Sequence, residues 1–85
     1  MTAVMSNDFM ERARKLAETR GDEMRAGWNA VIDALTPLYK SHRPAPRSFE
    51  VHHATENARK AFLGAWLDGK SPESAVEAGV AAGRL

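Results

Sequence analysis

Glu50 and His53 are the residues whose types and spacing come closest to a metal site. A Glu-x-x-His spacing places both side chains on adjacent turns of one helix face, as in helical bundles that bind paired iron ions through carboxylates. Such a site needs a second copy of the motif, which this chain lacks and only a symmetric dimer would supply. His53 also points away from the apolar side of its expected helix. We therefore predict no metal, and we keep a Glu50/His53 metal-binding oligomer as an alternative function.

Motifs for catalysis are missing from the sequence. Ser, His, Asp and Glu occur, but no Gly-x-Ser-x-Gly turn presents a nucleophile. There is neither a phosphate-binding loop nor a Gly-x-Gly-x-x-Gly fingerprint, so no nucleotide cradle is expected. The absence of Cys excludes disulfides, thiolate zinc sites and cysteine nucleophiles. We predict a protein that is not an enzyme, with no catalytic residues and no cofactor.

Basic residues stand without any acid in one segment, KSHRPAPR, from Lys40 to Arg47. Arg43 and Arg47 on an extended loop could follow a phosphate backbone. However, the net charge of +1 is far below the basic excess of a dedicated nucleic-acid binder. A nucleic-acid-binding accessory protein that uses this linker is the second alternative function, and a solubilising hinge is the simpler interpretation.

The elements that must position these residues are amphipathic helices. At 100° per residue, apolar residues of the first half stay within about 60° of one line. They are Phe9, Ala13, Leu16, Ala17, Met24, Trp28, Val31, Leu35 and Leu38. This stripe predicts a helix over 8–40 after a flexible N-terminus, 1–7, with Ser6 or Asp8 as its N-cap.

Gly21 is the point at which the first helix could divide. Glycine is common just after a helix and Asp22 is a common helix start, so two helices could meet here. A division normally resets the phase of the stripe, yet Leu16 stays in line with Met24 and Trp28. We therefore favour one continuous helix and keep a break at Gly21 as the alternative.

Two shorter helices follow a proline-rich basic turn over 41–48, where the prolines exclude helical backbone. Apolar spacing predicts a helix over 49–68 with Ser48 as its cap, ended by Gly69. The sequence Ser-Pro-Glu then starts a last helix over 72–83.

These lengths predict an all-α single domain over 1–85. At about 1.5 Å per residue, the two shorter helices placed end to end match the first helix in length. We therefore expect a small helical bundle or hairpin of three to four helices, in which the two shorter helices fold back along the long one.

Small residues and aromatics indicate where a partner could bind. Gly79 and Gly83 lie four residues apart, so one face of the last helix has almost no side chain. Such a face usually allows tight packing inside the protein, and less often it is the surface on which a partner packs. A chain this short has difficulty burying all its aromatics, and exposed aromatics mark interfaces. The candidate partner-binding residues are Trp28, Tyr39, Arg43, Arg47, Trp66, Gly79 and Gly83.

Together these patterns predict a non-enzymatic protein–protein interaction module: an assembly subunit, an adaptor or a small inhibitor of a larger complex that presents a helix face. Because 85 residues form a thin core, we expect the partner to be another protein or a second copy. The longest mostly apolar run, 75–82, is too short to span a bilayer. Residues 1–8 lack the basic and apolar regions of a secretory signal, so we expect a cytoplasmic protein and no membrane partner.

Overall fold

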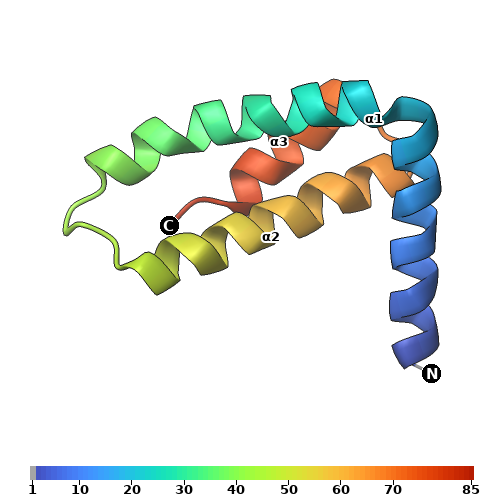
Figure 1. The fold of residues 1–85 in the computed structure, drawn as a ribbon. Coiled ribbons are helices and arrows are strands. Elements are labelled where there is room, and N and C mark those ends of the chain that lie inside the picture. Colours follow the sequence, from blue (N-terminus) through green and yellow to red (C-terminus); the bar gives the residue numbers. More distant parts are fainter. Residues whose placement is uncertain (1) are drawn as a thin grey trace.

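Three helices make up the computed structural model, which describes residues 2–85, with side chains from Met10 onward. Their bounds are Thr2–Ser41 for α1, Ser48–Leu67 for α2 and Pro72–Ala82 for α3 (Figure 1). The described residues contain no strand, so the all-α prediction is confirmed. The helix over 2–41 includes most of the segment 1–7 that was expected to be flexible. The expected caps and Phe9 lie outside the described side chains.

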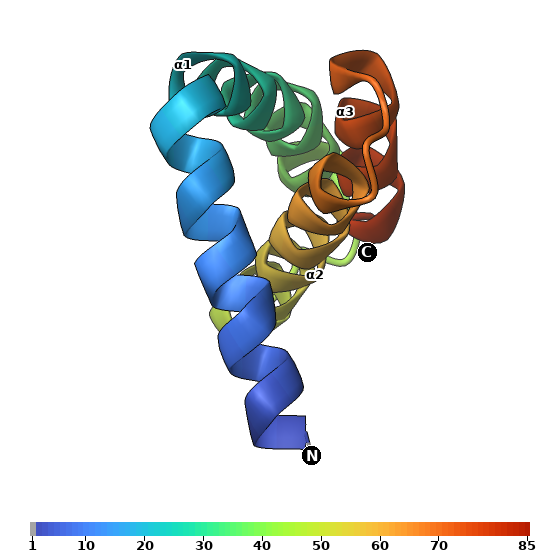
Figure 2. The ribbon, with the colours of Figure 1, turned by 90° about the vertical axis from the view of Figure 1, so that its right-hand side faces the viewer.

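The first helix bends sharply at Arg20, whose backbone is not helical (φ −131°, ψ 26°). The segment 2–19, called the arm below, turns away from the segment 21–41, called the spine (Figure 2). The continuous helix that we favoured is therefore wrong, and the alternative of a break at Gly21 is confirmed to within one residue, because the chain changes direction at Arg20. Helical structure otherwise continues through Pro37 to Ser41.

α3 folds back against α2 instead of extending α2 along the spine. α2 runs antiparallel to the spine, and α3 packs against both helices (Figure 1). Its contact with α2 is the most extensive in the molecule, and the contact between α1 and α2 is the smallest. The expected end-to-end arrangement of the two shorter helices is therefore wrong, because the small side chains of α3 allow it to lie close to both neighbours.

The core lies where the spine, α2 and α3 meet. Phe62 is at its centre, 2% exposed, with its ring centroid 5.8 Å from that of Trp28 and 6.4 Å from that of Trp66. The buried apolar residues are Met24, Val31, Leu35, Ala54, Ala58, Phe62, Ala65, Trp66 and Ala75. The stripes expected on the first two helices supply most of this set. Leu38 alone among the large residues of the spine's stripe is exposed.

Local signals fixed the helix ends well. The Ser71 hydroxyl accepts a hydrogen bond from the Ser74 amide at 3.1 Å, and Gly69 has the positive φ of 79° expected after α2. At the start of α2 the cap residue is Arg47 rather than Ser48, and the Glu50 carboxylate accepts from its amide at 2.9 Å. Within residues 2–85, no helix has both the length and the apolar character needed to cross a bilayer.

Candidate functional site

Both tryptophans predicted to contact a partner lie in or against the core. Trp66 is 3% exposed, and Trp28 is half-buried against Phe62. Because these rings fill the space between the spine and α2, little of either is offered to another molecule.

The small-residue face of α3 is also turned inward. A Cβ atom added at Gly83 would lie 2.5 Å from Leu35 Cδ1 and 3.0 Å from Ala58 Cβ. One added at Gly79 would lie 3.0 Å from Val31 Cγ2. Both glycines therefore serve internal packing, the more common of the two readings of this spacing, and the fold does not present them to a partner.

Tyr39 ties the end of the spine to the end of α3. Its hydroxyl donates a hydrogen bond of 2.6 Å to the Gly83 carbonyl, and its ring is half-buried. Sequence spacing gave no sign of this pairing, because the two residues are far apart in the chain.

The two linker arginines differ in their surroundings. The Arg43 guanidinium donates to the carbonyls of Lys40 and His42, each at 3.0 Å, and so satisfies acceptors at the C-terminal end of α1. Arg47 starts α2 through its backbone, and its side chain is exposed. Arg43 is thus engaged in holding the linker, whereas Arg47 has its charge in solvent.

An apolar groove opens at the linker end of the molecule. Phe49 is 65% exposed, Leu38 44% and Leu85 43%. A space of about 630 Å³ lies beside Phe49, Leu85 and the α2 residue His53, and an adjoining space of about 330 Å³ lies beside Leu38, Tyr39 and Leu85. Arg84 and Leu85 line both spaces. We call this surface the end groove and define it by Leu38, Tyr39, Phe49, His53, Arg84 and Leu85.

Comparison with protein-family models, curated proteins and solved structures finds no match. The function is therefore argued from the geometry of this chain.

Of the residues that define the end groove, the sequence singled out Tyr39 as a partner contact and His53 as a possible metal ligand, and it indicated no site role for the others. Leu38 was placed on the buried stripe, but the spine and α2 diverge toward the linker and leave it uncovered (Figure 1). Phe49 does carry a signal in the sequence, because it precedes the apolar line of α2 that begins at Val51 and falls outside it. A large aromatic off the core stripe of an amphipathic helix is a candidate contact residue.

The charge around the end groove is positive. Arg47, Arg84 and Lys40 are exposed at this end, and the acidic Glu50, which lines the larger space, accepts a hydrogen bond from the Arg47 amide. The N-terminus of α2 adds the positive end of its helix dipole. The groove therefore combines an apolar floor with a cationic rim.

The structure gives limited support to the two alternative sites. Among the described side chains, 10–85, no three His, Asp or Glu gather closely enough to hold a metal, so a Glu50/His53 site still requires a second copy. The turn over 68–71 joins α2 and α3 at the length typical of a helix-turn-helix unit. However, the exposed residues of α3 include Glu73 and Glu77 and no basic residue, so this helix would repel phosphate.

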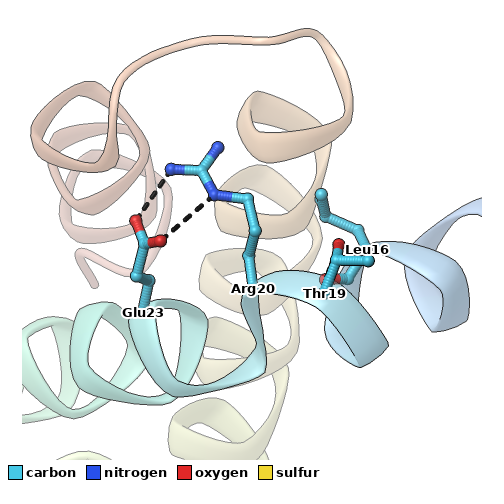
Figure 3. A network of polar contacts seen from close by, with 4 residues as sticks. All are labelled: Leu16, Thr19, Arg20 and Glu23. Atoms are coloured by element: carbon cyan, nitrogen blue, oxygen red, sulfur yellow. Dashed lines mark hydrogen bonds and ion pairs between the residues drawn. The ribbon is translucent and has the colours of Figure 1, made fainter.

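The bend in α1 carries a small polar network (Figure 3). The Thr19 hydroxyl donates to the Leu16 carbonyl at 3.2 Å, a bond that favours bending of a helix. The Arg20 guanidinium donates to the Glu23 carboxylate at 2.7 Å and lies 4.4 Å over the ring of Trp66. The hydrogen bond from Arg20 lowers the pKa of Glu23 below its ordinary value of 4.5.

Acid should loosen this bend. A carboxyl with a lowered folded-state pKa contributes stability that is present above its ordinary pKa of 4.5 and is lost as the pH falls through the lowered value. We expect the indole N–H resonance of Trp66, which lies under Arg20, to shift when the pH is lowered from 7 to below 4.5. In Glu23→Gln the same titration should shift the Trp66 resonance much less. An equal shift in both proteins would show that the Arg20–Glu23 ion pair does not hold the bend.

Proposed function

We propose that this protein is a non-enzymatic protein–protein interaction module, and that its end groove binds an acidic segment of another protein through apolar anchor residues. The observation that carries the proposal is the convergence of three exposed apolar side chains, Leu38, Phe49 and Leu85, on one hollowed surface. Contiguous exposed apolar surface of this kind is typical of interaction sites.

The rim supports an acidic partner. Arg84 lines both halves of the groove, and Arg47 is exposed at its edge. Opposite charge across an interface sets orientation and raises the association rate, whereas buried apolar anchors supply most of the affinity. A helix or extended segment with two or three large apolar residues flanked by Asp or Glu meets both requirements.

A protein partner accounts for this surface better than a nucleic acid does. Arg43 donates to two backbone carbonyls, so its side chain is held against the linker instead of reaching into the groove. The floor of the groove is apolar, and its large aromatics are Tyr39 and Phe49, which stands beside Glu50. The geometry at this end therefore favours side chains over phosphates as the bound groups.

Phe49→Asp should abolish capture of the partner. The immobilised protein is exposed to extract from the cells that produce it, and captured proteins are quantified by mass spectrometry. For each protein that the native chain retains, we expect the captured amount to fall at least about tenfold with Phe49→Asp, because the substitution removes one apolar hot-spot anchor. Met10→Asp is the matched control, because Met10 is also 65% exposed but lies on the arm.

The same experiment separates the competing explanations. Equal capture by Phe49→Asp and Met10→Asp would contradict the proposal, provided that circular dichroism shows both variants folded. Retention that disappears after nuclease treatment would assign the groove to nucleic acid instead. Capture that persists after nuclease but weakens in high salt and in Arg84→Glu supports an acidic protein segment.

A further inference from the structure

The bend in α1 depends on a single residue. Arg20 alone has non-helical backbone angles, and helix continues on both sides of it. On one side Leu16 packs against the core, and on the other Met24 is buried in it. At 100° per residue these two positions differ by about 80° in an unbroken helix, so both also lie on one face when the helix is straight. The apolar pattern is thus compatible with a bent helix and with a straight one.

The arm is held on α2 by a small set of contacts, called the arm seat below. Leu16 packs on the core, and the Arg12 guanidinium donates a hydrogen bond of 3.2 Å to the Leu67 carbonyl at the end of α2. A space of about 390 Å³ remains between the two helices, lined by Lys15, Leu16 and Trp66 among others. Nearer the N-terminus, the Met10 side chain is 65% exposed.

We propose that two copies of this chain exchange their arms: α1 straightens at Arg20, and the arm of each copy occupies the seat on α2 of the other. Exchange preserves the seat contacts, since Leu16 and Arg12 meet the same groups on a second chain. It also returns Arg20 to helical backbone angles, which the bent chain gives up. A straight monomer would leave the seat empty and Leu16 uncovered, so the second copy is required. Domain swapping of this kind is a low-cost route to a dimer.

This inference depends on the bend alone and is independent of the end groove. The seat lies at the C-terminal end of α2, and the groove lies at its N-terminal end (Figure 1). The two surfaces are therefore tested by different variants.

Gly21→Ala should favour the dimer. Glycine disfavours a continuous helix more than it disfavours the first turn after a break, so alanine stabilises the straight form selectively. Nothing lies within 4 Å of the added Cβ. We expect the dimer association constant from sedimentation equilibrium to rise by about tenfold, since the straight helix is stabilised in both chains of the dimer.

Gly64→Ala is the matched control for this change. Gly64 also lies inside a helix with nothing within 4 Å of an added Cβ, but that helix is α2, which is unbroken whether α1 is bent or straight. We expect it to leave the association constant unchanged. A Gly21→Ala protein that stays monomeric up to millimolar concentration, or a rise of equal size in both variants, would overturn the proposal.

Crosslinking shows whether a dimer is formed by arm exchange. The native chain has no Cys, so Lys15→Cys and Leu67→Cys, on opposite sides of the seat, can be placed on separate chains. After the two variants are mixed, denatured together and refolded, a short bis-maleimide should join them as a covalent heterodimer. The same reagent should yield little of either homodimer. A dimer that crosslinks only through Phe49→Cys, in the end groove, would overturn arm exchange and place self-association elsewhere.

Discussion

Phe62→Ala should lower the free energy of unfolding by about 3–5 kcal/mol. The ring is 2% exposed and packs between the two tryptophans at the meeting point of the spine, α2 and α3. Removing it deletes the apolar contacts of a whole ring and leaves a cavity that these neighbours fill only in part. Since small domains are stable by about 5–15 kcal/mol in total, we expect a protein close to its unfolding threshold.

Phe49→Ala provides the matched control, since it removes the same group from a site that is 65% exposed. We expect a change within about 0.5 kcal/mol, as is usual for substitutions on the surface. Urea denaturation followed by circular dichroism measures both. Similar losses in the two variants would show that Phe62 is not the centre of the core.

The second large loss of folding stability is expected for Gly83→Ala. Its α-helix-like φ of −87° would accept alanine, so the expected loss is purely one of space. The new Cβ would lie 2.5 Å from Leu35 Cδ1 and 3.0 Å from Ala58 Cβ, and both neighbours are buried. Such overpacking typically costs about 1–3 kcal/mol, and here it would also displace the carbonyl that accepts from Tyr39.

Gly64→Ala tests whether the loss at Gly83 is specific. The added methyl group meets open space inside α2, so helix propensity should make this variant more stable by up to about 1 kcal/mol. The two substitutions should therefore change the urea midpoint in opposite directions. A Gly83→Ala protein as stable as the native chain would mean that α3 can move away from the spine at no cost.

Helix positions could be predicted because they depend on local chemistry. Ser71 caps α3 and Gly69 adopts positive φ through interactions within a few residues of the chain, so spacing and residue type were sufficient. The core residues of α2 and the spine followed from helical periodicity for the same reason. The N-cap of α2 was displaced by one residue because Glu50 satisfies the Arg47 amide, a reciprocal contact that residue preference alone does not rank.

The sites were much harder to predict. Tyr39 was chosen as a candidate contact residue from its type alone, and its bond to Gly83 joins distant parts of the chain that spacing does not pair. The end groove exists because the spine and α2 diverge near the linker, which leaves Leu38 uncovered, and because Phe49 lies off the buried face of α2. An apolar residue on a stripe carries no information about where the neighbouring helix ends.

The sequence by itself determined that the chain is helical, where α2 and α3 begin and end to within one residue, and which faces of α2 and the spine are buried. The tertiary structure decided the direction of the chain at Arg20 and the return of α3 onto α2. The physical reason is that an apolar stripe of constant phase can be buried equally well by a straight helix and by a bent one. The choice between them rests on Arg20 over the ring of Trp66 and on Leu16 against the core, contacts that exist only once α2 has folded back beside the arm.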